Sequence, residues 1–207
     1  MAPVYKLKSY DYVGVAESIR YLFAYGGIQY ENIVLKKDIT ITEVQKTIPF
    51  GKLPVLAVND TILFHPVPMC WYVGKNVGLT SDIDIEEAEL GAISAAVFDL
   101  GEKVFQWYLE EDKYKKEKLE SELQEDIYPK YLTDFEEIAQ KKGGYFGGKK
   151  ISWSDVCFAG VLVTVQGVWK KDVLQKQYPL LYQIYRDVHN IPAIKAYVSK
   201  NVATYKY

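Results

Sequence analysis

The spacing of hydrophobic residues changes character at about residue 80. Before that point, short strand-like segments alternate with helical ones. Residues 4–10 alternate apolar and polar side chains as a strand does, and residues 15–25 carry apolar side chains at helical spacing before Gly26-Gly27. The pattern then predicts a strand at 28–35, an irregular helix at 40–47, a hairpin of 54–58 and 61–64, and a short helix at 69–77.

Beyond about Asp82 the pattern is helical only. Five segments have helical periodicity without strand signals, at 84–109, 115–141, 154–168, 179–189 and 192–200. The β-α-β-α-β-β-α order of the first part is that of a thioredoxin-like domain. We therefore predict an α/β thioredoxin-like N-terminal domain at 1–78 and an all-α C-terminal domain at 82–207, joined by the link at 78–81.

The segment from Ser152 to Asp155 is typical of a capping box, with Ile151 and Val156 placed as a hydrophobic staple. It predicts the start of a buried helix. The glycine-rich loop at 141–150 lies just before it and lacks the spacing of a phosphate-binding motif, so we interpret it as a connection between helices.

Composition narrows the classes of function. The chain has 207 residues, of which 49% are hydrophobic, and its 25 basic residues are scattered among 27 acidic ones. Because the basic residues are neither in excess nor clustered, the charge distribution argues against nucleic acid or an anionic membrane as a partner. Because we see neither an apolar run of membrane-spanning length nor a signal peptide, we expect a cytoplasmic protein. Cys70 and Cys157 lack metal-ligand spacing, so we expect buried thiols and no metal.

Four stretches carry a resemblance to a known family. They are PFGKLPVL at 49–56, SWSDV at 152–156, IPAIKAYVSK at 191–200, and the long N-terminal stretch at 5–31. Together they resemble the sigma class of cytosolic glutathione transferases, which includes insect transferases, haematopoietic prostaglandin D synthase and the lens S-crystallins. The resemblance implies the two-domain glutathione transferase fold, a homodimer, and glutathione as the ligand.

The resemblance also implies roles for residues that match the family pattern. Lys52 would face the glycyl carboxylate of glutathione. Leu53 would precede a cis-proline, Pro54, and bond the cysteinyl unit through its backbone. Asp99 would reach across the dimer toward the glutamyl amine.

Other positions depart from the family pattern. Ser9 stands where the family has its catalytic tyrosine, and Tyr10 follows it. A phenol with a pKa of about 10 lowers the pKa of a thiol by donating to the thiolate, whereas a serine hydroxyl is a weaker acid. Val15 stands where the family has a supporting arginine, and Gln45 lies near the position of a family lysine.

The stretch FHPVPMCWY at 64–72 changes the turn that holds the glutamyl carboxylate. Where the family has Gln-Ser before a helix, this chain has His65-Pro66. Proline has neither an N–H nor a hydroxyl, so both donors are lost. If two or three bonds to a charged group, each of ~1.5–3 kcal/mol, are missing, glutathione binds on the order of a thousandfold more weakly.

Two functions remain open. The first is a divergent sigma-class protein with weak or no conjugating activity, acting as a binder of apolar small molecules or as a structural protein. Its apolar cleft would be lined by Tyr10, Tyr12, Trp107 and Tyr108, although core packing explains these rings equally well. The presence of only two methionines argues against an S-crystallin. The alternative is an active transferase or glutathione-dependent isomerase using Tyr10 or Ser9, although neighbouring strand side chains point to opposite faces.

Overall fold

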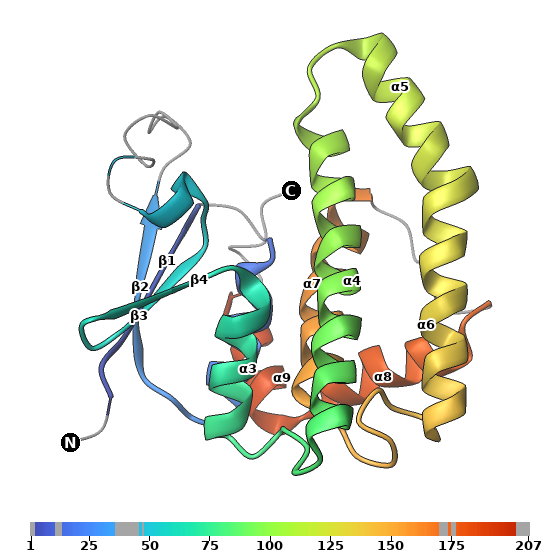
Figure 1. Cartoon of the computed structure of the whole chain (residues 1–207). Coiled ribbons are helices and arrows are strands. Elements are labelled where there is room, and N and C mark those ends of the chain that lie inside the picture. Colours follow the sequence, from blue (N-terminus) through green and yellow to red (C-terminus); the bar gives the residue numbers. More distant parts are fainter. Residues whose placement is uncertain are drawn as a thin grey trace.

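The computed structural model of the chain describes residues 3–10, 14–35, 46, 48–169, 174 and 177–201, without the side chains of 167–169. The helix that we expected at 40–47 therefore lies almost wholly outside the described residues. Figure 1 shows a small sheet with its helices on one side of the molecule and a taller group of helices on the other.

A four-stranded sheet forms the N-terminal half. Its strands are β1 (Tyr5–Tyr10), β2 (Tyr30–Leu35), β3 (Val55–Val58) and β4 (Thr61–Phe64), in the order β2-β1-β3-β4. β1 pairs parallel to β2 and antiparallel to β3, and β3 pairs with β4 through a hairpin. Asn59 begins the hairpin turn with φ of 52°, a conformation that asparagine tolerates better than most residues. The predicted strands are confirmed.

Two helices and the buried face of the sheet share one core with the helical half. α1 (Ala16–Tyr25) and α3 (Pro66–Asn76) contact each other. Leu7 of β1, Leu22 of α1 and Met69 of α3 are fully buried and belong to the same apolar cluster as the C-terminal helices. This mixed sheet with its helices confirms the thioredoxin-like class of the first half. The exact boundary between residues 78 and 82 stays a prediction.

The C-terminal half is helical. It comprises α4 (Asp84–Leu109), α5 (Lys113–Glu122), the π-helical turn η2 (Leu123–Ile127), α6 (Tyr128–Lys142), α7 (Trp153–Trp169), α8 (Pro179–Asn190) and α9 (Pro192–Asn201). The single helix expected over 115–141 is confirmed as one unbroken helical run from α5 to α6, within which η2 is a π-helical turn. This turn lies just before Pro129, whose missing N–H and bulky ring do not fit regular α-helical hydrogen bonding.

α7 joins the two halves. It packs against both α4 and α1. The Ser18 hydroxyl of α1 donates to the carbonyl of Cys157 at 3.1 Å. A side chain at Gly160 would come within 2.8 Å of the Ser18 backbone, so only glycine permits this approach of the two helices. Glycine here fixes the spacing between the α/β half and the helical half.

The predicted start of α7 is confirmed, with one difference in detail. Asp155 accepts from the backbone N–H of Ser152 at 2.8 Å, as a capping box requires. The Ser152 hydroxyl, however, donates to the same carboxylate at 2.6 Å. Asp155 also accepts from the N–H of Phe146 at 2.8 Å and that of Gly147 at 3.4 Å, so it ties the glycine-rich loop to the helix. Burial raises the pKa of this carboxyl, and these four bonds oppose the rise.

A half-buried histidine makes the fold sensitive to pH. His189 of α8 bonds the Tyr185 carbonyl through Nδ1 at 2.7 Å, and its Nε2 lies 3.1 Å from the Tyr21 hydroxyl of α1. Because a carbonyl only accepts, Nδ1 carries the proton and Nε2 accepts from the tyrosine. Burial lowers the pKa of His189 below its usual value near 6.5, and the bond to Tyr185 offsets part of this.

We expect acid to destabilise the protein through His189. Because the folded-state pKa lies below the unfolded one, the unfolded chain binds a proton first as pH falls below about 6.5. The free energy of unfolding measured in urea should therefore drop between pH 7.5 and pH 5.5, and His189→Gln should reduce this drop. His65→Gln removes the chain's other histidine and serves as the control. An equal drop in His189→Gln and wild type would contradict the assignment.

Candidate functional site

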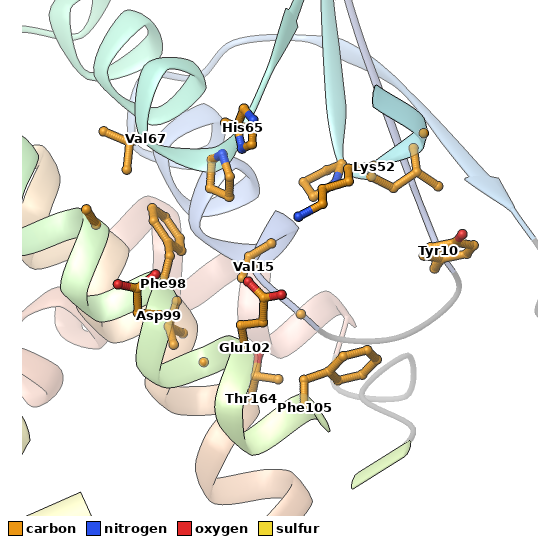
Figure 2. A pocket seen from close by; sticks show the side chains of 18 residues that line it. Tyr10, Val15, Lys52, His65, Val67, Phe98, Asp99, Glu102, Phe105 and Thr164 are labelled. Atoms are coloured by element: carbon orange, nitrogen blue, oxygen red, sulfur yellow. The ribbon is translucent and has the colours of Figure 1, made fainter. Parts of the chain in front are cut away.

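A cavity of about 440 Å³ lies between the two halves of the molecule. Such a volume suits a small organic molecule. Figure 2 shows side chains entering it from the N-terminal half on one side and from α4 and α7 on the other. Its lining comprises Tyr10, Gly14, Val15, Gly51, Lys52, Leu53, Pro54, His65, Pro66, Val67, Ala95, Phe98, Asp99, Gly101, Glu102, Phe105, Val161 and Thr164.

A tight turn presents Lys52 to the cavity. The 3-10 turn η1 (Pro49–Gly51) contains two successive residues with positive φ, Phe50 at 58° and Gly51 at 62°. The chain then runs extended through Lys52, whose ammonium points into the cavity (Figure 2). The following peptide bond, Leu53-Pro54, is cis, as the resemblance implied.

The start of α3 forms another part of the wall. α3 begins at Pro66 and not at Met69 as expected, because prolines fit the first turn of a helix, whose N–H groups have no intrahelical partner. His65 precedes the helix with φ of 65° and ψ of 137°, and no side chain caps the helix. Since Pro66 and Pro68 lack an N–H, Val67 has the one backbone donor among the first three residues of the helix.

Ser9 is buried and its hydroxyl is engaged elsewhere. The side chain is 3% exposed; its oxygen accepts from Nη2 of Arg20 at 2.7 Å and donates to the carbonyl of Tyr10 at 3.3 Å. Arg20 in turn donates to Glu17 at 3.0 Å, in a buried ion pair. Because a serine hydroxyl has a single proton to donate, Ser9 can donate to a ligand only if its bond to the Tyr10 carbonyl breaks. A small hollow of about 30 Å³, lined by Ser9, Val15 and Leu53 among others, adjoins the cavity at this point.

Tyr10 lies at the edge of the cavity. β1 pairs with β2 in unbroken register through Ser9 and Tyr10, so the strand has no bulge there and the two side chains point to opposite faces. Tyr10 packs against the small apolar cluster of Ile48 and Val55, as Leu53 and Phe64 also do. Figure 2 shows it far from Phe98 and Asp99.

Two carboxylates line the opposite wall. Asp99 and Glu102 lie three residues apart on α4, on the same face of the helix. Gly101 lies between them, where a side chain would come within 2.8 Å of Val161 on α7. Asp99 was expected at the site from the family resemblance, whereas Glu102 was not. The three-residue spacing between Glu102 and Asp99, within a segment predicted to be helical, was the feature of the sequence that could have identified Glu102.

The remaining predicted site residues are only partly brought together. Val15 lines the cavity at the start of α1. Trp107 and Tyr108 do not belong to its lining: Trp107 packs on the core with the Lys116 ammonium 5.6 Å from its ring, and Tyr108 lies 6.1 Å from the ring of Phe105. Phe98 and Phe105 supply the aromatic lining from α4. Tyr12 and Gln45 lie outside the described residues.

Both cysteines are buried with free thiols, as predicted. Burial raises the pKa of the Cys157 thiol well above its usual range, and the neighbouring Cys70 adds to the rise. Within the part of the chain that the structure describes, we find no group of three or more His, Cys, Asp or Glu side chains that could hold a metal ion. The helices described there are all too short or too polar to cross a membrane.

Comparison with known proteins identifies the family. Residues 98–201 match the family model described as glutathione S-transferase, C-terminal domain. The chain is 33% identical over 202 residues to hematopoietic prostaglandin D synthase of Gallus gallus, covering 98% of both chains. It is 30% identical over 201 residues to glutathione S-transferase S1 of Drosophila melanogaster, covering 97% of this chain and 80% of that one.

A solved structure agrees with these sequence relatives. Rat hPGDS complexed with a quinoline has a TM-score of 0.83 at 31% identity, covering 96% of this chain and 97% of that one. The α/β sheet half, the helical half and the cavity between them thus define a glutathione transferase fold. The chain belongs to the glutathione S-transferase family, and its relatives place it in the sigma-like branch as a divergent member.

Proposed function

We propose that this chain is a cytoplasmic glutathione transferase-like protein that binds apolar small molecules and conjugates glutathione weakly or not at all. The observation that carries the proposal is the position of Ser9. Its hydroxyl bonds Arg20 and the Tyr10 carbonyl, so the catalytic position of the family has no phenol and no uncommitted donor. A thiolate in the cavity would lack the bond that lowers the pKa of the thiol.

The lining of the cavity supports binding of an apolar ligand. Five apolar side chains face it from four elements of the fold: Val15, Val67, Phe98, Phe105 and Val161. Each contributes surface that a ligand would remove from water, at about 25 cal/mol per Å². The rat relative was solved with a quinoline, an aromatic compound, which supports the same class of ligand for this chain.

Tyr10 gives the alternative its support. It lines the cavity, so a shift at the end of β1 would bring its phenol toward a bound thiol in an active transferase or glutathione-dependent isomerase. The unbroken register of β1 opposes such a shift. We therefore place the binding function first and the rebuilt enzyme second.

The conjugation assay separates these functions. With glutathione and a generic electrophilic aromatic, we expect turnover barely above the uncatalysed rate, because Ser9 cannot stabilise the thiolate as a phenol does. The binding function would be wrong if turnover were robust. Tyr10→Phe and Ser9→Ala would then identify the activating hydroxyl, since only its removal should lower kcat strongly.

We also propose that the protein is a homodimer, as most relatives of this fold are. In the single chain, Trp71 of α3 and Ile85 of α4 are exposed, at 38% and 69%, and a shallow hollow of about 380 Å³ lies between these helices. Such apolar surface is typical of a contact with another protein. Sedimentation at micromolar concentration should give a dimer, and Trp71→Glu should weaken it. A wild-type monomer would contradict the proposal.

A further inference from the structure

We propose that Cys70 of α3 and Cys157 of α7 are a redox-active pair, which forms a reversible disulfide in the folded protein and ties its two halves together. The chain has two cysteines. Both are fully buried free thiols, and both belong to the apolar core that the two halves share. This inference is independent of the ligand-binding function proposed above.

α3 and α7 approach each other closely beside this pair. A side chain at Gly74 of α3 would come within 2.5 Å of the Trp153 side chain of α7, so glycine is required at this contact. Cys70 lies one turn before Gly74 on α3, and Cys157 lies one turn after Trp153 on α7. If the helices run antiparallel along this contact, the two cysteines lie opposite each other.

The thiols themselves show that this is the arrangement. The side chains of Cys70 and Cys157 are hydrogen-bonded to each other across the boundary between the halves. A disulfide places its two Cβ atoms about 3.5–4.5 Å apart, a separation suited to facing side chains on closely packed helices. The pair therefore needs little movement of the backbone to form the bond.

A peroxide is the oxidant in the proposed reaction. One cysteine, as its thiolate, attacks a peroxide oxygen, and the O–O bond breaks to give a sulfenic acid and hydroxide, which takes up the proton that the thiol lost. The second cysteine then attacks the sulfenic sulfur, forms the S–S bond and releases the oxygen as water. The two thiols lose two electrons and two protons, and one hydrogen peroxide becomes two waters.

Burial makes the first step slow and proximity makes the second step fast. Burial raises the pKa of the Cys157 thiol, whereas the Ser94 hydroxyl of α4 bonds this sulfur and favours the thiolate. Peroxide reaches the sulfurs when α3 opens briefly from α7. Once a sulfenic acid forms, the partner thiol already lies beside it. We therefore expect the disulfide to form slowly, with little sulfenic or sulfinic acid accumulating.

The bond would hold two walls of the cavity together. Pro66 lies one turn before Cys70 on α3, Val161 lies one turn after Cys157 on α7, and both line the cavity. Because the bond joins residues far apart in the sequence, it also restricts the unfolded chain. The oxidised protein should therefore resist unfolding more strongly than the reduced protein.

Thiol labelling with mass spectrometry tests the bond. We would treat the folded full-length protein with hydrogen peroxide, remove the excess with catalase, and block the remaining thiols with iodoacetamide in denaturant. We expect chains that have lost two hydrogen atoms, take up no iodoacetamide and run as single chains on a non-reducing gel. Dithiothreitol should restore two reactive thiols. Because the chain has two cysteines, this result assigns the bond to Cys70 and Cys157.

Urea unfolding tests whether the bond ties the halves together. The equilibrium constant for unfolding should fall about a hundredfold on oxidation, and dithiothreitol should reverse the change. Cys70→Ala and Cys157→Ala each remove one partner and are the matched controls, since peroxide can also oxidise methionine. After the same treatment, neither variant should form an intramolecular disulfide or become more resistant to urea.

Other results would overturn the proposal. Two reactive thiols that persist in folded wild type, with a disulfide forming only in denaturant, would show that the pair does not react in the folded protein. Disulfide-linked dimers, or sulfinic acid in place of the S–S bond, would show that the two thiols do not react with each other. A disulfide that leaves the unfolding constant unchanged or raises it would show a strained bond that does not stabilise the contact between α3 and α7.

Discussion

Replacing His65-Pro66 by Gln-Ser is expected to tighten glutathione binding by about ten- to a hundredfold. The double substitution restores one backbone N–H and one hydroxyl at the start of α3, where the helix dipole favours a carboxylate. We expect the net gain of about one such bond to a charged group, worth ~1.5–3 kcal/mol or roughly ten- to a hundredfold, because the positions of Val15 and Gln45 still lack their family contacts. Calorimetric affinities of wild type and the double variant give the comparison, with folding checked by circular dichroism.

Pro68→Ala is the matched control for this experiment. It restores an N–H two residues further into the same turn, without the hydroxyl or the residue pair of the family. We expect it to change glutathione affinity far less than the double substitution. Micromolar binding by wild type, or a folded double variant that binds no better, would show that the turn does not limit glutathione binding. Conjugation should stay low in either case, because Ser9 is unchanged.

Removing the Asp155 carboxylate is expected to destabilise the fold by about 3–5 kcal/mol. In Asp155→Ala, the N–H groups of Phe146, Gly147 and Ser152 and the hydroxyl of Ser152 all lose their acceptor. The side chain is fully buried, so water does not replace the lost bonds. The free energy of unfolding, from urea titrations followed by circular dichroism, measures the loss.

An exposed aspartate provides the comparison for Asp155. Asp134 pairs with Lys130 at 2.7 Å on the surface of α6, where both side chains are about half exposed or more. Asp134→Ala should change the free energy of unfolding by less than about 1 kcal/mol, because exposed ion pairs contribute little. Similar losses in the two variants would mean that the network around Asp155 is not the main support of the glycine-rich loop.

Most of the fold was predictable because its apolar spacing is regular. The hairpin turn at Asn59-Asp60 and the start of α7 at Ser152 have local signals, and the structure confirms both. Periodicity correctly indicated one long helix over 115–141, but it did not indicate the π-helical turn before Pro129, because the apolar spacing continues across that turn. α3 starts three residues before the expected Met69, because the first turn of a helix accepts Pro66 as well as Pro68.

The candidate site was predictable only in part. The resemblance located the positions of Lys52, Pro54 and Asp99, and all three line the cavity. The direction of the Ser9 hydroxyl depends on Arg20, which lies eleven residues away on another element. The residues next to Ser9 in the sequence therefore do not predict where its hydroxyl points. Glu102 is absent from the family pattern used, and only the geometry of α4 against the cavity brings it in.

The glycine contact between α1 and α7 limits how this chain can be recombined with its relatives. A chimera joined in the link between α3 and α4 would take α1 from one parent and α7 from the other. Gly160 of α7 accepts the Ser18 backbone at a distance that leaves no room for a side chain. A parent with any larger residue at the position of Gly160 would force the two helices apart and widen the cavity that both help to form. Successful exchanges should therefore carry α1 and α7 together, although they lie in different halves of the chain.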